Sequence, residues 1–259
     1  MAEDKATKRS PLKDRPLRNP GQSLDNAIER QFDEEAMPYF LVSLGTVVLA
    51  ALEWWRFTHP SPPTPWTYTI FSAMVVGYSA FRTVKIVRKV RSMKLGRDGE
   101  KVVGQFLDEL RAKGATVFHD IPANGFNVDH VVISPKGIYV IETKTYSKPN
   151  GREATVRYDG VKLTVDGKPP SRDPVKQVQA IAAWVRAFLA ESTGKTFSIK
   201  PVVVFPGWYV EPVHAAHGNV WVLNHKALPS FIQNDKGDLP PEDVKLVSYH
   251  LSRYIRTQS

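Results

Sequence analysis

Three charged residues interrupt two apolar stretches of this sequence, where unpaired charges are costly. Asp129 stands in NVDHVVIS (127–134), and Glu142 and Lys144 stand in IYVIETKT (138–145). Alternation and β-branched residues predict that both stretches are strands, so Glu142 and Lys144, two positions apart, point to one face. Two carboxylates and an ammonium group in one place can bind a hard divalent cation and stabilise a phosphoryl transition state.

The segment between these stretches, SPKG (134–137), predicts a tight turn, because proline suits its second position and glycine supplies a positive φ. Such a turn closes an antiparallel hairpin and brings Asp129 about level with Glu142. We expect a glycine bulge to shift the register by one, so that both carboxylates share a face. The alternative is a buried ion pair of Lys144 with one carboxylate, which leaves the other carboxylate unexplained.

Two carboxylates at this distance repel each other, and a divalent cation would relieve the repulsion. The sequence has no cysteine, and its seven histidines match no ligand spacing such as H-E-x-x-H. A disulfide scaffold, thiol catalysis and thiolate zinc sites are therefore excluded. Oxygen ligands predict Mg²⁺ or Mn²⁺ at Asp129 and Glu142, with Lys144 orienting water or neutralising developing charge.

The residues around these groups have the pattern of an α/β domain. A helix is expected first, with Val103, Phe106, Leu107 and Leu110 on its apolar face. Asp173-Pro174 is a typical helix start, and PVVVF (201–205) a typical buried strand. The expected elements are a helix over 95–113, strands at 116–121, 127–134 and 138–145, a hairpin near 154–166, a helix over 173–192, strands at 201–205 and 219–223, and helices near 226–233 and 240–256.

Residues 36–81 contain only two formal charges, Glu53 and Arg56. Two apolar runs, Pro38–Leu52 and Trp66–Phe81, are separated by a proline-rich loop that cannot continue a helix. With their flanking aromatic residues, both runs approach the roughly 20 residues that span a bilayer. The sequence predicts two transmembrane helices; the alternative is a soluble hairpin, which would need a polar face that neither run has.

The distribution of charge predicts the orientation of these helices. Net charge is +9 and the pI about 9.6, which indicates an anionic partner. Residues 82–97 carry seven basic residues and no acidic one, and such a flank stays cytoplasmic and attracts anionic lipid. We therefore expect a multi-pass membrane protein with two spans and both termini in the cytoplasm.

The expected domains are a disordered cytoplasmic tail over 1–35, the two spans with a basic juxtamembrane helix over 36–94, and a soluble domain over 95–259. The tail is polar, with mixed charges and scattered prolines. No apolar stretch follows its early basic residues, so it does not look like a signal peptide.

Four blocks of the sequence, in order, resemble the nuclease-related domain called NERD, within the PD-(D/E)xK nuclease superfamily. An Asp followed by E-x-K on the next strand is the core of that superfamily, although Val128 stands where its name has proline. The resemblance covers roughly 95–210 and implies a restriction-endonuclease-like mixed central sheet flanked by helices. It also implies metal-dependent hydrolysis of nucleic acid, with DNA the expected substrate. The blocks are GRDGEKVV (96–103), FNVDHVVISPKGIYVIETKTYS (126–147), DPVKQVQA (173–180) and PVVVF (201–205).

The resemblance adds two site residues. Glu100 matches the first-helix glutamate of such domains, which reaches the metal directly or through water; the alternative is a carboxylate favoured by the helix macrodipole. Gln177 matches the glutamine of the second helix, which contacts the site or a DNA strand; the alternative is a partly buried polar residue. Ile181 stands where a wider glutamine–tyrosine motif has tyrosine.

Two further groups are weaker candidates. His119 and His130 flank the strands without an obvious Asp or Ser partner, and His130 is expected to be structural. Trp208 and Tyr209, with histidines at 214 and 217, would either stack bases or form a loop with buried aromatic rings.

The sequence thus predicts a membrane-anchored, divalent-metal-dependent nuclease. Its site would contain Asp129, Glu142, Lys144, Glu100 and Gln177, with Asp129, Glu142 and Glu100 as metal ligands. One alternative is a non-catalytic nucleic-acid-binding module of the same fold. Another is a membrane scaffold whose basic stretch binds lipid and whose α/β domain binds protein.

Overall fold

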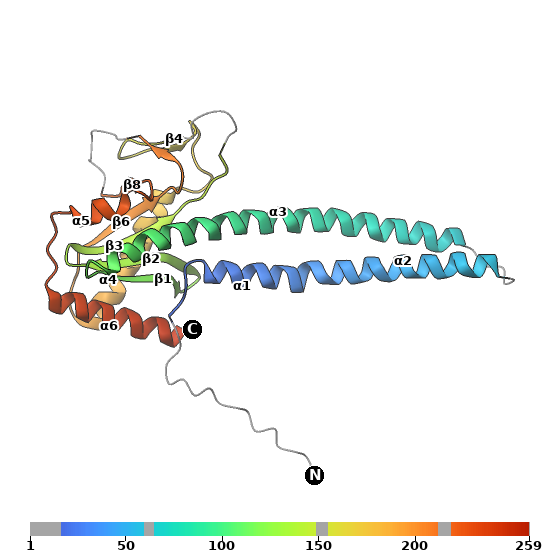
Figure 1. Cartoon of the computed structure of the whole chain (residues 1–259), viewed down its shortest axis with the longest axis horizontal. Helices are drawn as coiled ribbons and strands as arrows, with labels where there is room; N and C mark the ends of the chain where they lie inside the picture. Colours follow the sequence, from blue (N-terminus) through green and yellow to red (C-terminus); the bar gives the residue numbers. More distant parts are fainter. Residues whose placement is uncertain (1–16, 60–64, 149–154, 212–218, 259) are drawn as a thin grey trace, which may run out of the picture. The chain divides into compact units, whose positions relative to one another are not determined.

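The computed structural model describes residues 17–59, 65–148, 155–211 and 219–258 (Figure 1). The chain divides into two compact units, Gln22–Asp98 and Met1–Gly21 with Gly99–Ser259. The division falls inside one helix, α3 (Pro65–Arg111), slightly after the boundary expected at residue 94. The two units are described separately below.

The unit Gln22–Asp98 is helical from its first residue. It contains α1 (Gln22–Arg30), a π-helical segment η1 (Gln31–Ala36), α2 (Met37–Thr58) and the first part of α3. The expected disorder up to residue 35 is therefore wrong from Gln22 onward, whereas residues 1–16 lie outside the described residues. The segment is helical because its apolar residues, although they stand between charged ones in the sequence, pack on α3: Ile28 is buried against Ile86 and Val90.

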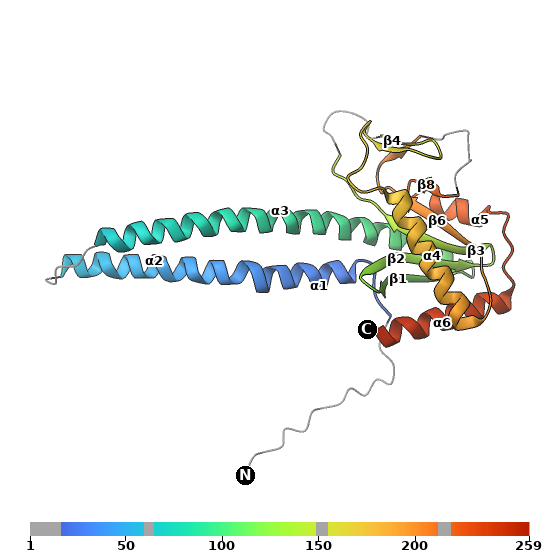
Figure 2. The same ribbon diagram turned by 180° about the vertical axis from the view of Figure 1, so that it is seen from behind.

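Helices α2 and α3 lie side by side in this unit (Figures 1 and 2). Trp54 Nε1 donates to Thr69 Oγ1 over 3.2 Å near one end, and Arg82 Nε donates to the Tyr39 hydroxyl over 3.1 Å near the other. The helices Gln22–Thr58 and Tyr68–Arg111 are long and apolar enough to cross a membrane by length and composition. The expected basic juxtamembrane helix is part of α3, and most of the expected loop, 60–64, lies outside the described residues.

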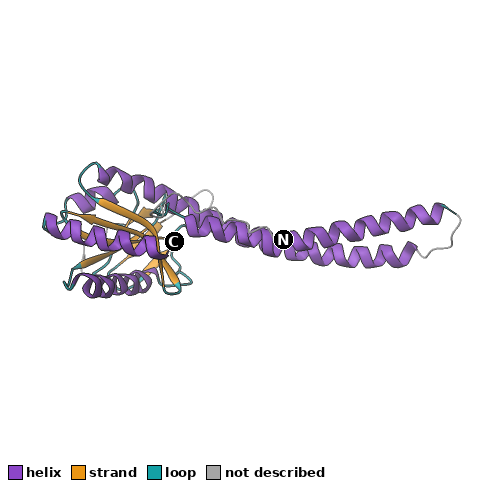
Figure 3. Cartoon of the chain, turned by 90° about the horizontal axis from the view of Figure 1, so that it is seen from below, coloured by secondary structure: helices purple, strands orange, loops and turns teal. Residues whose placement is uncertain are grey.

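The second unit is built on a five-stranded mixed sheet in the order β1-β2-β3-β6-β8. Figure 3 shows strands in orange with helices around them. Strands β1 (Thr116–Ala123), β2 (Phe126–Ser134) and β3 (Gly137–Thr143) form an antiparallel meander. Strands β6 (Ile199–Val204) and β8 (Trp221–Leu223) then extend the sheet parallel to β3. PVVVF is thus central, as its fully apolar composition predicts.

Helices cover both faces of this sheet, as Figure 2 shows for α4. One face packs against α4 (Pro174–Thr193) and α6 (Pro241–Gln258), and the other against the end of α3 and α5 (Leu228–Gln233). Alternation assigns the strand residues: Val131, Val140 and Val203 face α4, whereas their neighbours face α3. The expected helices and strands of this domain are confirmed, within a few residues at their ends.

A second, three-stranded sheet has the order β5-β4-β7. Strands β4 (Thr155–Tyr158) and β5 (Leu163–Val165) form the expected hairpin. The two-residue strand β7 (Tyr209–Val210) pairs with β4 and was not predicted, because two residues carry no periodicity.

Candidate active site

The β2–β3 hairpin places Asp129 and Glu142 beside each other. Its register pairs Ser134 with Gly137 and His130 with Ile141, so Asp129 and Glu142 are the next opposed positions. The backbone N–H of Thr143 donates to Asp129 Oδ2 over 2.7 Å and holds that carboxylate at the strand end. The predicted turn is confirmed but the predicted bulge is wrong, because opposed residues of an antiparallel pair already share a face.

Glu142 is the centre of the polar contacts in this region. Its Oε1 accepts hydrogen bonds from Lys144 Nζ at 2.5 Å and from Gln177 Nε2 at 2.7 Å. Its side chain is only 4% exposed, and Oε2 is buried without a hydrogen-bond partner among the described residues. A buried carboxylate oxygen of this kind is costly unless a cation or donor meets it.

Gln177 reaches Glu142 from the first turn of α4. Asp173 caps that helix, because its Oδ1 accepts from the N–H of Val175 at 3.0 Å and of Lys176 at 3.4 Å. Pro174 occupies the first turn, where its missing N–H costs nothing. The structure therefore brings Gln177 to the carboxylates by a well-defined helix start.

Glu100 joins the group from helix α3. A Cβ atom at Gly99 would overlap the side chain of Thr145, so only glycine allows α3 to approach the end of β3 this closely. Glu100 follows directly and receives a hydrogen bond from the backbone N–H of Gly21. The carboxylate thus faces the others from the helix side.

The pKa values of all three carboxyl groups are raised, first of all by burial. Burial, then the charges of Asp120 and Glu142, raise the pKa of Glu100 to about 8. Burial, then the charges of Glu142 and Glu100, raise the pKa of Asp129 well above its ordinary value. Burial also raises the pKa of Glu142, which the neighbouring Lys144 opposes. The site therefore disfavours three ionised carboxylates beside one ammonium group, and a bound cation would favour their ionised form.

Sequence reasoning missed a fourth carboxylate, Asp120, on β1. The register of β1 and β2 places it opposite Asp129, and its φ of 48° lies in the left-handed region that Asp tolerates better than most residues. Asp120 is buried, bonded to Arg18 Nη1 at 3.2 Å and to Asn127 Nδ2 at 3.0 Å. The sequence did contain a signal for Asp120, because it is an acidic residue inside the apolar stretch TVFHDI, just as Asp129 is an acidic residue inside the next strand.

The donor set fits a hard divalent cation in part. Oxygen donors predominate, and Glu142, opposed to Asp129 in the hairpin, has one buried oxygen without a hydrogen-bond partner among the described residues. Among the described residues, however, no group of three or more His, Asp or Glu side chains has the arrangement of a metal cage. Mg²⁺ commonly binds through one or two carboxylates and completes its shell with water and substrate phosphate, so a partial protein shell suits it.

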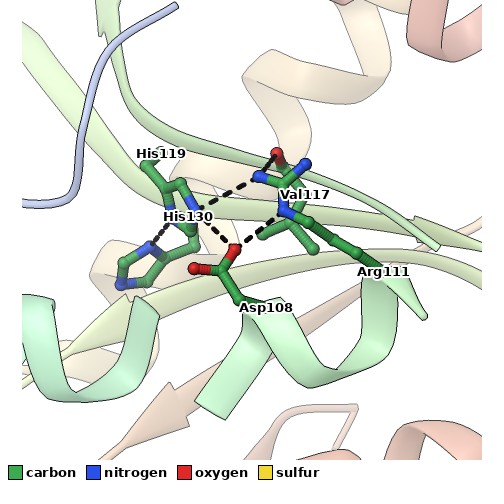
Figure 4. Close-up of polar contacts among 5 residues, drawn as sticks. All are labelled: Asp108, Arg111, Val117, His119 and His130. Carbon is green, nitrogen blue, oxygen red and sulfur yellow. Dashed lines mark hydrogen bonds and ion pairs between the residues drawn. The ribbon is translucent and has the colours of Figure 1, made fainter. Parts of the chain in front are cut away.

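A separate polar cluster lies on the other face of the same strands (Figure 4). His119 and His130 meet with their Nδ1 atoms 2.8 Å apart, and Arg111 donates to Asp108 at 2.7 Å and to the carbonyl of Val117 at 2.5 Å. Burial lowers the pKa of His119 to about 4 and that of His130 well below its ordinary value. Both rings are therefore neutral near pH 7.

The sequence suggested no acidic partner for His119, but Asp108 Oδ1 lies 3.7 Å from its Nε2. His130 points to the face opposite Asp129, as expected, and ties β2 to β1 rather than reaching the carboxylates. Of the proposed stacking residues, Trp208 is buried and Tyr209 is half exposed, and the histidines at 214 and 217 lie outside the described residues.

Comparison with known proteins finds a family match over the region that carries this site. Residues 95–206 match the family model of the nuclease-related domain, NERD. An uncharacterized protein of Bacillus anthracis is 33% identical over 66 residues, which are 24% of this chain and 31% of that protein. The chain thus spans about a third of the length of that relative. No solved structure gives a significant match.

Proposed function

We propose that the unit Gly99–Ser259 is a divalent-metal-dependent nuclease of the PD-(D/E)xK type with a restriction-endonuclease-like core. The observation that carries this proposal is that the two carboxylate oxygens of Glu142 differ in their hydrogen bonds. Its Oε1 is held by Lys144 and Gln177, while its buried Oε2 has no hydrogen-bond partner among the described residues, and Asp129 occupies the opposed position on β2. The match of residues 95–206 to a nuclease-related domain supports nucleic acid as the substrate.

Asp129 and Glu142 would hold the cation, with Glu100 reaching it directly or through water. A bound Mg²⁺ or Mn²⁺ supplies Lewis-acid polarisation of the phosphate and lowers the pKa of a water molecule. Lys144 neutralises negative charge that develops on the phosphate oxygens or orients the attacking water. Gln177 fixes the carboxylate plane of Glu142, so that Oε2 is presented in one orientation.

We also propose that α2 and the first part of α3 anchor the protein in a membrane. Large apolar side chains on both helices are exposed, among them Trp55 at 66% and Met74 at 62%. So many exposed large apolar side chains on two neighbouring helices call for lipid or another apolar partner. Arg88, Arg91 and Lys94 are exposed after the apolar part of α3 and would face anionic lipid in the cytoplasmic leaflet.

The test is cleavage of labelled DNA and RNA by the full-length protein in detergent micelles with Mg²⁺ or Mn²⁺. Asp129→Asn and Glu142→Gln should abolish cleavage, and calorimetry should show loss of metal binding. Glu109→Gln removes an exposed carboxylate elsewhere on α3 and is the matched control. A parent protein that binds no metal and cleaves no form of nucleic acid would instead favour the binding-module or scaffold alternative.

A further inference from the structure

The open edge of the five-stranded sheet carries a large groove, here called the β8 groove. It has a volume of about 1530 Å³ and runs along β8, between α4, α5 and the small sheet. Pockets for small ligands usually hold roughly 300–1,000 Å³. The size of the β8 groove is therefore better suited to a stretch of polymer than to a single small molecule.

Aromatic rings line both sides of this groove. Trp221 lies against Phe231 with ring centroids 5.6 Å apart, and Phe231 is 46% exposed. Tyr209, on the side of the small sheet, is 50% exposed. Exposed rings at a groove wall offer faces on which unpaired bases stack, and such stacking tolerates any base sequence.

The charge of the groove favours an anionic polymer. Arg186, Lys200 and Lys236 line it, and Lys200 Nζ lies 5.1 Å from the centroid of the Trp221 ring. None of the three forms an ion pair with a carboxylate in the part of the chain that is described. Both acidic lining residues already hold a partner: Glu211 binds Arg157 at 2.6 Å, and Asp235 accepts from the Tyr139 hydroxyl at 2.9 Å.

The groove lies near the carboxylate site, although neither Glu142 nor Lys144 is among the described residues that line it. Glu142 pairs with Val203 of β6, and Val203 pairs with Val222 of β8, which lines the groove. This row shares one face, and two strand spacings amount to roughly 10 Å. Trp208, another lining residue, donates from Nε1 to the carbonyl of Tyr146 at 3.2 Å, just after Lys144 in the chain.

We infer that the β8 groove binds single-stranded nucleic acid and guides the strand toward Glu142 and Lys144; this inference rests on the proposed nuclease function. Stacking on Tyr209 and Phe231 requires bases whose faces are free, which a duplex does not offer. Arg186, Lys200 and Lys236 contact the phosphates. The substrate class is therefore a single strand or the single-stranded end of a duplex.

The experiment measures binding in EDTA, where cleavage plays no part. Fluorescence anisotropy of the full-length protein in micelles is recorded with oligothymidylate of about 20 nucleotides, which covers the site sizes of single-strand-binding folds, and with a duplex of equal length. The parent should bind the single strand at least about tenfold more tightly. Tyr209→Ala with Phe231→Ala should weaken that binding about tenfold or more, since each stacked base contributes measurably. Tyr249→Ala, a 61% exposed ring on α6 outside the groove, should leave affinity unchanged.

The basic residues are tested by their salt dependence. The triple variant Arg186→Gln, Lys200→Gln, Lys236→Gln should reduce the slope of log affinity against log salt by about 2, at about 0.7 per phosphate contact. Arg253→Gln, an exposed arginine of α6, is the matched control. A parent with no affinity for any oligonucleotide would overturn the inference, as would equal affinity for duplex, and so would groove variants that bind like their controls.

The experiments distinguish a failure of the proposed nuclease activity from a failure of the proposed strand-binding groove. Asp129→Asn should stop cleavage and keep strand binding in EDTA. Groove-dependent strand binding without cleavage by the parent would reject the hydrolytic activity and support the groove. Cleavage by the parent with normal binding by every groove variant would reject the groove and support the active site.

Discussion

Gln177 Nε2 donates a hydrogen bond to Glu142 Oε1 over 2.7 Å, which joins the first turn of α4 to the end of β3. The same oxygen accepts from Lys144 Nζ, so two donors hold Oε1, whereas Oε2 has no hydrogen-bond partner in the part of the chain that the structure describes. A salt bridge with Lys144 would be enough to neutralise Glu142. The additional hydrogen bond from Gln177 fixes the orientation of the Glu142 carboxylate, which a purely structural ion pair does not require.

Gln177→Ala should therefore lower kcat without unfolding the protein. A hydrogen bond to a charged group contributes about 1.5–3 kcal/mol, which corresponds to a loss of roughly tenfold to a hundredfold. Single-turnover cleavage measures this effect, and circular dichroism checks the fold. Gln105→Ala, an exposed glutamine on α3, serves as control. Parent-like turnover by the Gln177 variant would contradict a positioning role.

Replacement of Lys144 separates the nuclease from the ion-pair alternative. In the nuclease, Lys144→Met should reduce the rate by about 10²–10³, because one electrostatic contact to the transition state is lost. Added Mn²⁺ should restore most of the thermal stability, since the cation takes over neutralisation of Glu142. In the alternative, breaking a buried pair costs about 3–5 kcal/mol and no divalent ion compensates. Melting curves with and without Mn²⁺ decide between the two.

The buried histidine pair predicts a loss of stability in mild acid. Burial lowers the pKa of His119 to about 4, below the ordinary 6.5, so the unfolded chain binds more protons between these values. Stability is complete above pH 6.5 and falls as the pH drops toward 4, by up to about 3 kcal/mol. Denaturant unfolding at pH 7 and pH 4.5 measures this, and His119→Asn should show a smaller fall than the control His250→Asn. An equal fall in both variants would contradict the assignment.

The membrane topology can be read with single cysteines, because the chain contains none. His59→Cys stands at the C-cap of α2, and Ser171→Cys is exposed in the α/β unit. In intact cells, a membrane-impermeant maleimide should label the first and spare the second until the membrane is permeabilised. Labelling of residue 171 from outside would reverse the orientation, and recovery of the protein in the soluble fraction would reject the spans.

Some elements could be predicted because local signals agreed. The proline–glycine turn after Ser134 and the alternation around it indicated the hairpin, and the Asp173-Pro174 start indicated α4. The helix around Ile28 was expected to be disordered, because its few apolar residues are buried only through packing on Ile86 and Val90, which are far away in the sequence. No local signal placed β6 between β3 and β8, since pairing across a crossover depends on tertiary packing.

Asp120 shows a second limit of sequence reasoning. Its left-handed backbone and its bond to Arg18, about a hundred positions away in the chain, depend on tertiary structure. The acidic residue within an apolar strand was visible, but nothing local distinguished a neighbour of the site from a structural carboxylate.

The sheet order has a consequence for the order of folding. Strands β1, β2 and β3 pair through short turns, whereas β6 reaches β3 only after α4 and the small hairpin intervene. Contacts of low sequence separation form sooner, because less chain entropy is lost on closing them. In pulse-labelling hydrogen exchange we expect amides of β2 to be protected before those of β6. Asp129 and Glu142 would then be brought together early in folding, before α4 carries Gln177 to them.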